Sequence, residues 1–592
     1  MCGIAGELRF DGAQISPTLV NKMLGVLEPR GPDGSGIFSQ GSMCFGHRRL
    51  KIIDLSDHAA QPMVDSELGL VIVFNGCIYN YPELRSELQK KGYKFFSTGD
   101  TEVLLKAYHA WGKDCVKRLQ GMFAFTIWER DTKRVFIARD RLGIKPFYYT
   151  KDHHRMVFAS TLPALLQTDG IDTSIDPVAL NYYMTFHSVV PAPHTILSGI
   201  RKLPPATMAI IEPDGRMVEE TYWALDYTRS AEDLARSEEE WIDAVEDVLT
   251  LAVKRRLVAD VPVGVLLSGG LDSSLVVGLL SALGQKGIST FSVGFEDVAE
   301  EEGNEFRFSD IIAERYSTDH HKIHVDHAEL QDNLSACVRA MSEPMVSHDV
   351  IGFYLLSREV SKHVKVVQSG QGADEVFAGY HWYPPLMEVG DNAAVQSYAD
   401  VFFDRSHAEY KSVVHSNYYG NDHALNFVSD HFSQPNITDP VDRALRLDTQ
   451  IMLVDDPVKR VDNMTMAWGL EARVPFIDHE LVELAAKIPA QCKVKDGGKY
   501  VLKEVGRRII PHEVIDRPKG YFPVPALKYL EGDYLDMARG ILTQDAAKHR
   551  GLFNSSYVDM LFQAPKEHIT PLRGSKLWQI TLLEYWLQEQ GL

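Results

Sequence analysis

Residues 263–280 constrain the fold of this chain more than any other segment, because an apolar run, a loop of serine and glycine, and a second apolar run follow one another there. An apolar run without alternation is typical of a strand buried on both faces of a parallel sheet. The loop Ser-Gly-Gly-Leu-Asp-Ser-Ser at 268–274 then leads into a predicted helix. Backbone N–H groups at a helix start, with hydroxyls beside them, bind anions. The pattern predicts a phosphate-binding β–α unit, the alternative being an ordinary glycine-bearing turn.

Three further segments have the composition of strands, at 289–295, 321–325 and 364–367, with helical patterns between them. This alternation predicts a doubly wound parallel sheet, whose ligands lie beyond the carboxyl ends of the strands. The last strand leads into Ser-Gly-Gln-Gly-Ala-Asp-Glu at 369–375. Both glycine-containing loops are therefore expected at one edge of the sheet.

Acidic residues in the two loops indicate a metal site. Mg²⁺ binds through one or two carboxylates together with phosphate oxygens. Asp272 in the first loop and Asp374 in the second are therefore predicted to hold Mg²⁺. The neighbouring Glu375 has either a catalytic or a helix-capping role, and the sequence leaves both open.

The chain begins Met-Cys-Gly-Ile, so removal of Met1 would leave Cys2 with a thiol and a free α-amine. The thiol titrates at about 8.5 and the amine at about 8, so the amine can accept the thiol's proton near neutral pH. Such a pair is a self-contained nucleophile and base. On position alone, an incidental cysteine in a frayed terminus would be the simpler interpretation.

Residues that such a thiol needs occur further along the chain. Arg49 is expected at a strand edge, where its guanidinium can hold a carboxylate. Asn75 and Gly76 follow the apolar strand 71–74 and can supply an oxyanion hole for acyl transfer. Asp100 is the predicted N-cap of a helix. Each has an ordinary structural explanation when it is taken singly.

Together, these motifs resemble the glutaminase domain of the N-terminal-nucleophile amidotransferases over about the first 220 residues. The resemblance implies that Cys2 attacks the side-chain amide of glutamine and releases ammonia, with Asn75 and Gly76 at the oxyanion. It also implies an α+β fold in which two sheets lie between two helical layers, an αββα sandwich. Arg49 would bind the α-carboxylate of glutamine.

The α-amine of glutamine would be bound by Asp100 in the same pocket. The family usually has glutamate after Asn-Gly as a second ligand for this amine, and this chain has Cys77. We expect glutamine to bind still, with Asp100 carrying more of the recognition.

The loop at 268–274 resembles the pyrophosphate-binding loop of ATP pyrophosphatases. With the segments 469–479 (Gly-Leu-Glu-Ala-Arg-Val-Pro-Phe-Ile-Asp-His) and 517–521 (Arg-Pro-Lys-Gly-Tyr), nearly the whole chain is similar to the glutamine-hydrolysing asparagine synthetase family. In that family ATP adenylates a carboxylate, and ammonia converts the acyl-adenylate to an amide with release of AMP and pyrophosphate. The resemblance implies ATP and Mg²⁺ as cofactors, with small molecules as the other partners.

The resemblance also assigns roles to residues of the second domain. The residues implied in ATP binding are Leu267, Ser268, Gly269, Gly270, Asp272, Ser273, Ser274, Val293, Ser369 and Gly370. Lys519 is the candidate for stabilising charge or moving a proton at the reacting centre, the alternative being a solvated surface lysine. Arg473 would either bind the carboxylate of the acceptor or tie two helices together through Glu471.

One departure bears on the acceptor. Asparagine synthetases usually carry an acidic residue in the 369–375 loop at the position of Gln371. A neutral amide there suits an acceptor without a free α-ammonium group. Some relatives amidate the blocked dipeptide N-acetylglutaminylglutamine, an osmolyte precursor, and segments 74–80 and 106–112 are similar to that branch. The expected acceptor is this dipeptide or, on comparable grounds, aspartate. The alternative function is a glutaminase or glutamine-sensing relic without synthetase activity.

Length and composition agree with this interpretation. A chain of 592 residues exceeds one ordinary core, and we expect a glutaminase domain at 1–225, a linker at 226–240 and an ATP pyrophosphatase domain at 241–592. The net charge of −20 argues against a nucleic-acid partner. Six cysteines without paired spacing predict a reducing, cytoplasmic environment, and no segment reads as a membrane span. Relatives are often dimers, so a homodimer is an open alternative.

Overall fold

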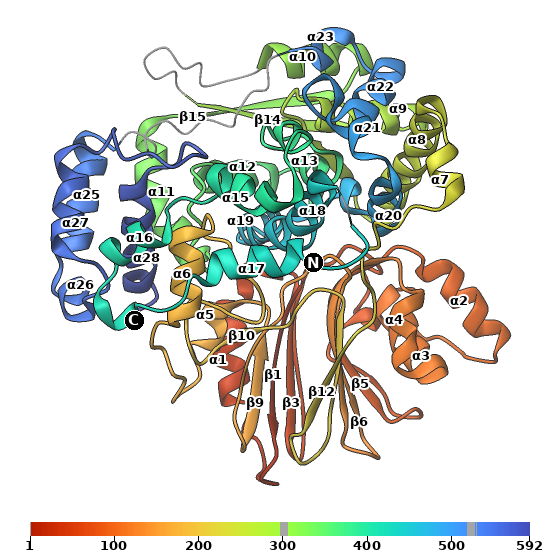
Figure 1. The fold of residues 1–592 in the computed structure, drawn as a ribbon. Coiled ribbons are helices and arrows are strands. Elements are labelled where there is room, and N and C mark those ends of the chain that lie inside the picture. Colours follow the sequence, from red (N-terminus) through yellow and green to blue (C-terminus); the bar gives the residue numbers. More distant parts are fainter. Residues whose placement is uncertain (1, 296–305, 438, 518–526, 528–529) are drawn as a thin grey trace.

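The computed structural model describes residues 2–295, 306–437, 439–517, 527 and 530–592. Two parts lie one above the other in Figure 1. The lower part carries strands β1–β12 and is called the N-terminal sandwich. The upper part surrounds strands β13–β17 and is called the C-terminal α/β part.

The N-terminal sandwich consists of two six-stranded antiparallel sheets, with strand orders β10-β8-β9-β1-β3-β2 and β12-β11-β7-β6-β5-β4. The alternation of side chains along β5 shows how the two sheets stack, because successive residues of a strand face opposite sides of its sheet. Val71 and Val73 pack into the core between the sheets, whereas Ile72 and Phe74 pack toward the helices on the outer face. The strands are β1 (Gly3–Arg9), β2 (Gly34–Gln40), β3 (Met43–Arg49), β4 (Met63–Asp65), β5 (Leu70–Ile78), β6 (Gly121–Glu129), β7 (Val135–Arg139), β8 (Tyr148–Lys151), β9 (Arg155–Ala159), β10 (Arg201–Lys202), β11 (Thr207–Ile211) and β12 (Met217–Thr221).

Helices cover both outer faces of the sandwich, which confirms the expected αββα layers (Figure 1). Helix α1 packs on β1 and β3, and α3 packs on β5. Two local predictions were wrong in detail. Strand β5 continues through Asn75 and Gly76, which pair with Ala124 and Phe123 of β6. The N-cap of α3 is Gly99. The helices of this part are α1 (Thr18–Val26), α2 (Tyr81–Lys90), α3 (Asp100–Trp111), α4 (Cys115–Arg118), α5 (Leu162–Leu165) and α6 (Pro177–Thr185).

The C-terminal α/β part contains a five-stranded parallel sheet of order β15-β14-β13-β16-β17. The doubly wound sheet is therefore confirmed, and β14 has the predicted bounds. Strand β15 begins two residues before the predicted 321, and β16 is shifted toward Gln368. The three-residue strand β17 was missed, since so short a segment has no periodicity to detect. The strands are β13 (Val263–Leu266), β14 (Ser289–Phe295), β15 (Asp319–Val325), β16 (Val366–Gln368) and β17 (Glu471–Arg473).

Helices pack on the parallel sheet, among them α9 against β13, and α10 and α12 against β14. The segment 381–439 is rich in aromatic residues and contains α14–α17, and Tyr398 and Phe402 stack within its core. The helices are α8 (Glu238–Arg255), α9 (Leu271–Ala282), α10 (Phe306–Tyr316), α11 (His327–Ala340), α12 (Val350–Val360), α13 (Ala373–Phe377), α14 (Tyr383–Leu386), α15 (Asp391–Phe402), α16 (His407–Val413), α17 (His423–Phe432), α20 (His479–Lys487), α21 (Ala490–Val494), α22 (Tyr500–Ile509), α23 (His512–Ile515), α25 (Gly532–Thr543), α26 (Asp545–Arg550), α27 (Ser555–Gln563) and α28 (Lys576–Glu589).

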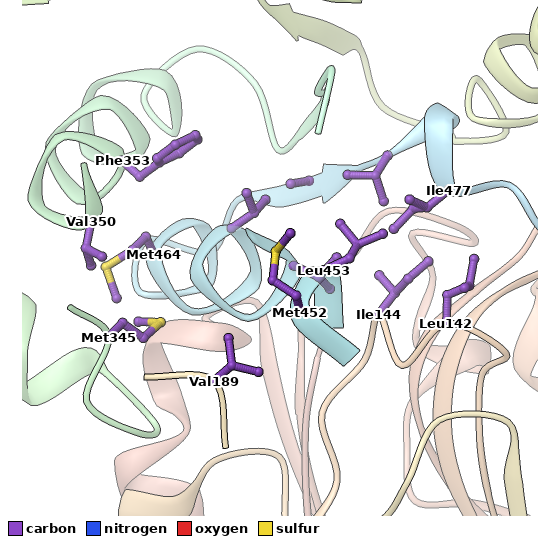
Figure 2. Packing of buried hydrophobic residues seen from close by; sticks show 14 of the residues in the cluster. Leu142, Ile144, Val189, Met345, Val350, Phe353, Met452, Leu453, Met464 and Ile477 are labelled. Carbon is purple, nitrogen blue, oxygen red and sulfur yellow. The ribbon is translucent and has the colours of Figure 1, made fainter. Parts of the chain in front are cut away.

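One long helical segment of the C-terminal α/β part packs against the sandwich. It comprises α18 (Pro440–Leu447), two π-helical stretches at Asp448–Met452 and Val454–Val458, and α19 (Lys459–Met466). Pro457 lies inside it and lacks an N–H for the regular ladder, which accounts for a π turn there. Figure 2 shows Leu453 of this segment near Ile144 of the sandwich, whereas Met464 lies near Met345 and Val350; all five belong to one cluster. A single apolar cluster therefore extends across the interface.

The predicted linker contains structure of its own. Helix α7 (Ala231–Ala235) and helix α8 each begin with a capping box, formed by Ser230 with Asp233 and by Ser237 with Glu240. Across the part of the chain that the structure describes, no helix combines the length and apolarity that a membrane crossing requires. The six cysteines are all buried and unpaired.

Candidate active sites

A cavity of about 30 Å³ lies beside Cys2, at the interface of the two parts. The sandwich contributes five of the six residues predicted for the glutaminase site, all but Asn75, and β17 contributes two more. The predicted residues on its wall are Cys2, Arg49, Gly76, Cys77 and Asp100, and those from β17 are Glu471 and Arg473. Segments far apart in the sequence therefore meet around one thiol.

The backbone of Cys2 is held on both sides. Its nitrogen donates to Asn75 Oδ1 at 3.0 Å, and its carbonyl oxygen accepts from Arg30 Nε at 3.3 Å. Burial raises the pKa of the Cys2 thiol, partly opposed by the backbone of Leu50 and by the charge of Arg49. A buried thiol of this kind needs an adjacent base to form the thiolate at neutral pH.

Asn75 and Gly76 fit an oxyanion hole. The Nδ2 atom of Asn75 is buried and has no hydrogen-bond partner among the described residues. An unpaired buried donor is costly, and this one is available to an incoming acceptor. A Cβ atom at Gly76 would lie 2.1 Å from the carbonyl oxygen of Met122, which explains why only glycine fits this position.

Arg49 and Asp100 are fixed on the cavity wall by backbone groups. Arg49 donates to the carbonyl oxygens of Asp54 and Ser56, the latter at 2.7 Å. Asp100 does not cap α3; its Oδ2 instead accepts from the backbone N–H of Ile78 at 3.1 Å. Burial raises the pKa of Asp100 to about 6. Arg49 and Asp100 thus offer one cation and one acid to a zwitterionic ligand, beside the Glu471–Arg473 ion pair on the same wall.

The side chain of Arg473 lines this cavity and not the ATP cavity, although its carbonyl oxygen accepts from the backbone N–H of Ser369 at 2.8 Å. Residues 471 and 473 of a strand face the same side, so Glu471 and Arg473 project together. Arg473 Nε lies 2.6 Å from Glu471 Oε1, and its Nη2 lies 3.7 Å from Cys77 Sγ. The expectation that Arg473 binds the carboxylate of the acceptor does not fit this placement. The pairing with Glu471 is present, but it lies within a strand and does not join two helices.

A larger cavity of about 800 Å³ lies at the carboxyl ends of β13, β14 and β16. Ligands bind at this edge in doubly wound sheets. The two glycine-containing loops meet there, since a Cβ atom at Gly370 would lie 2.9 Å from the backbone nitrogen of Ser273. The predicted residues on its wall are Leu267, Ser268, Gly270, Asp272, Ser273, Val293, Ser369, Gly370, Gln371 and Asp374.

Three predicted residues of the two glycine-containing loops are not on the described wall of the larger cavity. Gly269 has φ 72° and packs against the backbone of Ser309, so its contribution is the shape of the loop. Ser274 is fully buried inside α9. Glu375 is also buried and accepts from Tyr380 Oη at 2.6 Å. Burial and then the charge of Asp374 raise the pKa of Glu375 to about 7.

Lys499 is the functional candidate that the sequence analysis missed. Its Nζ atom lies 2.7 Å from Asp272 Oδ2 and 2.9 Å from Asp374 Oδ1. Burial opposes the charged form, yet the two carboxylates raise the pKa of Lys499, so it stays a cation. The only local signal was the preceding pair of glycines, which gave no indication of its partners.

Asp272 and Asp374 fit the predicted magnesium site. Both carboxylates contact the ammonium of Lys499, so their oxygens lie close together. Both also line the larger cavity beside the phosphate-binding loop. Two carboxylates with phosphate oxygens are the ligand set that Mg²⁺ takes. Lys519, the predicted cation, falls within 518–526 and lies outside the described residues. Arg517, two positions earlier, lines the cavity.

Comparisons with known proteins match both parts. The asparagine synthase family model matches residues 244–588, and the glutamine amidotransferase domain model matches residues 1–223. Asparagine synthetase [glutamine-hydrolyzing] 1 of Bacillus subtilis is 31% identical, covering 99% of this chain and 96% of the relative. A putative asparagine synthetase of Mycobacterium tuberculosis is 32% identical, covering 93% of this chain and 91% of the relative.

Two more distant similarities differ in extent. Amidase chyE of Penicillium rubens is 27% identical, with 93% of each chain covered. The solved structure of glutamine phosphoribosylpyrophosphate amidotransferase from Bacillus subtilis is 20% identical with a TM-score of 0.28, covering 49% of this chain and 65% of that one. On the family match and the full-length relatives, the chain belongs to the asparagine synthase family and is a glutamine-hydrolysing amidotransferase.

Proposed function

We propose that this enzyme converts a carboxylate to an amide with ATP, using ammonia that Cys2 releases from glutamine. The observation that carries the proposal is the presence of two separate cavities, one around Cys2 and one around the phosphate-binding loops. We assign the glutaminase reaction to residues 1–225 and amide synthesis to residues 241–592, joined by 226–240.

The glutaminase reaction starts at the N-terminus. Once Met1 is removed, the α-amine of Cys2 takes the thiol proton, and the thiolate attacks the side-chain amide carbon of glutamine. The oxyanion accepts hydrogen bonds from Asn75 Nδ2 and from the N–H of Gly76. The amine returns its proton to the departing nitrogen, and water hydrolyses the thioester to glutamate. Arg49 binds the α-carboxylate of glutamine, and Asp100 binds its α-amine.

The synthetase reaction takes place in the larger cavity. An oxygen of the acceptor carboxylate attacks the α-phosphorus of ATP, and pyrophosphate leaves. Lys499 stabilises the negative charge that develops on the phosphate oxygens, and Ser268, Ser273 and the backbone at Gly370 bind phosphate groups. Asp272 and Asp374 would hold Mg²⁺, which neutralises phosphate charge. Ammonia then attacks the acyl carbon, AMP leaves, and the amide forms after loss of one proton.

Ammonia has to reach the adenylate without protonation in bulk water. The apolar cluster at the interface supports a dry route, because it includes Cys77 on the glutaminase side and Leu453, labelled in Figure 2, near the second loop. A Cβ atom at Gly372 would lie 3.8 Å from a methyl group of Leu453, which places this residue next to the 369–375 loop.

For the acceptor we propose N-acetylglutaminylglutamine, with aspartate as the second candidate. Gln371 lies on the wall of the larger cavity and supplies a neutral amide there. An acceptor with a blocked amino group needs no carboxylate to bind an α-ammonium. We place the reaction in the cytoplasm, since all six cysteines are unpaired thiols.

Pyrophosphate release tests the proposal. The enzyme is supplied with Mg-ATP and glutamine, and with either aspartate or the blocked dipeptide. Release with the dipeptide alone supports our assignment. Release with aspartate alone makes the enzyme an ordinary asparagine synthetase. Glutamine hydrolysis without pyrophosphate release from either acceptor would contradict the proposed synthesis and favour the relic.

A further inference from the structure

Arg30 connects the backbone of Cys2 to the C-terminal α/β part. It ends the short helix Glu28–Arg30, and its guanidinium is buried at the interface. Its Nε atom donates to the carbonyl oxygen of Cys2 at 3.3 Å. Its Nη1 and Nη2 atoms donate to Asp462 Oδ2 and Oδ1 at 2.9 and 3.4 Å. One planar side chain therefore touches the nucleophilic residue and a carboxylate of α19.

Asp462 is a buried carboxylate with two cationic partners, both from the sandwich. Lys145 Nζ lies 3.2 Å from its Oδ1, the oxygen that Arg30 Nη2 also contacts. Burial opposes ionisation, yet the charges of Arg30 and Lys145 lower the pKa of Asp462. The carboxylate is therefore ionised at neutral pH, and it binds the guanidinium through both oxygens. A two-point contact of this kind orients the plane of an arginine as well as its charge.

The orientation of Arg30 matters because Cys2 becomes a chain terminus. A terminal residue has few covalent restraints, and terminal residues are poorly ordered unless other groups hold them. Here the nitrogen is held by Asn75 and the carbonyl oxygen by Arg30. If the carbonyl contact were lost, Cys2 could turn about the remaining contact, and its thiol and amine would leave their working geometry.

We propose that Asp462 is a positioning residue for the glutaminase reaction, acting on Cys2 through Arg30. The inference rests on the proposed role of Cys2 as nucleophile. It means that a residue of the C-terminal α/β part completes the geometry of the glutaminase site. The same long helical segment contacts α13 near the ATP loops, where Thr449 Oγ1 donates to the carbonyl oxygen of Glu375 at 3.1 Å.

The test compares the full-length variants Asp462→Asn and Asp462→Glu. Asp462→Asn keeps the shape but loses the charge that orients Arg30. We expect its kcat for glutamine hydrolysis to fall on the order of 10- to 100-fold, because small misplacements of reacting groups cost this much. The KM for glutamine should change less, since Arg49 and Asp100 are held by backbone groups of the sandwich and not by Asp462. Asp462→Glu should restore part of the rate.

Three further measurements separate positioning from a general structural role. Synthesis driven by added ammonia should continue in Asp462→Asn, and alkylation of Cys2 by iodoacetamide should slow. The double variant with Arg30→Met should be no slower than Arg30→Met alone, because Asp462 acts through Arg30. The matched control is Lys365→Met, which removes another ion pair between the two parts, to Asp33 at 2.7 Å, without touching Cys2. Its glutaminase rate should stay near that of the wild type.

Undiminished glutamine hydrolysis in Asp462→Asn would overturn the inference, and so would an equal loss of glutamine-driven and ammonia-driven synthesis. If Asp462→Asn does not fold, Arg30→Lys replaces it, since one ammonium cannot serve both Cys2 and Asp462; an undiminished rate in that variant would likewise overturn the inference. Cys2→Ala, measured in parallel, tests the underlying function. Glutamine hydrolysis by Cys2→Ala would refute the nucleophile role of Cys2 and the positioning role of Asp462. If Cys2→Ala loses glutamine hydrolysis while Asp462→Asn keeps the normal rate, only the positioning role is refuted.

Discussion

The ammonium group of Lys499 lies 2.7 Å from a carboxylate oxygen of Asp272, on the wall of the cavity formed by the two glycine-containing loops. The two residues are separated by 227 positions in the chain. Asp374 lies on the other side of the same ammonium at 2.9 Å. A cation held between the carboxylates predicted to bind Mg²⁺ is well placed to stabilise phosphate charge during adenylation.

We expect Lys499→Met to lower the rate of pyrophosphate release by roughly 10²- to 10³-fold, the usual cost of losing one group that stabilises developing charge. Glutamine hydrolysis should persist, since the Cys2 cavity is separate. The control is Lys495→Met, which removes an exposed lysine paired with Glu238. Pyrophosphate release at the wild-type rate in Lys499→Met would exclude Lys499 from stabilising phosphate charge and leave Lys519 as the candidate cation.

Cys2→Ala should abolish glutamine-driven synthesis and spare synthesis from added ammonia. The reason is that the thiol makes the thioester, while the larger cavity is intact. Amide formation from each nitrogen source provides the measurement. Cys44→Ala is the control, because Cys44 is a buried sandwich cysteine that does not line the Cys2 cavity. If glutamine still drove synthesis in Cys2→Ala, the nucleophile would have to be another residue.

The glutaminase reaction should weaken in mild acid. Burial raises the pKa of Asp100 to about 6. Above this pH the carboxylate is ionised and can bind the α-amine of glutamine, and below it the group is neutral. The kcat/KM for glutamine should therefore fall about tenfold per pH unit below 6. Asp100→Asn should be slow at every pH and lack this limb. A wild-type profile that stays flat down to pH 5 would argue against the role of Asp100.

Asp448 should make stability depend on pH. It is fully buried and accepts hydrogen bonds from Tyr383 at 2.5 Å, from Tyr398 and from Trp382. Burial raises its pKa to about 6, from 3.8, despite these donors. Between these values the native state holds a proton that the unfolded state has released. Stability therefore falls as pH rises from about 4 to about 6, by up to about 3 kcal/mol.

Asp448→Asn removes this titration. The difference between the urea midpoints of variant and wild type should change across pH 4–6 and be constant above it. A difference that is constant throughout the range would show that Asp448 keeps an ordinary pKa.

Gln371→Glu should shift preference toward aspartate, because a carboxylate on this wall can bind an α-ammonium group. The ratio of pyrophosphate released with aspartate to that released with the blocked dipeptide is the measurement. Gln371→Ala separates charge from size, and it should not favour aspartate. An unchanged ratio in Gln371→Glu would remove this residue from acceptor selection.

Local sequence was sufficient for the elements that position the phosphate-binding loop. The apolar run at 263–267, the glycines after it and the apolar residues that follow are neighbours in the chain, and they form β13 and α9 as expected. The same holds for β14, whose bounds coincide with the predicted 289–295. Five residues on the wall of the Cys2 cavity were also singled out, but only through resemblance to a family whose motifs occur in the same order.

The sequence by itself thus determined the two folds and the reaction class, because periodicity, turn residues and motifs are local properties. Tertiary structure alone decided which distant residues share a site. Arg473 was expected beside the acceptor, yet it lies against Cys77, because β17 pairs with β16 and projects toward the sandwich. No local pattern identified the partners of Lys499 or Asp462, since these partners lie far away in the sequence. Contacts between buried charges depend on how the two parts pack against each other, and this packing produces no periodic pattern in the sequence.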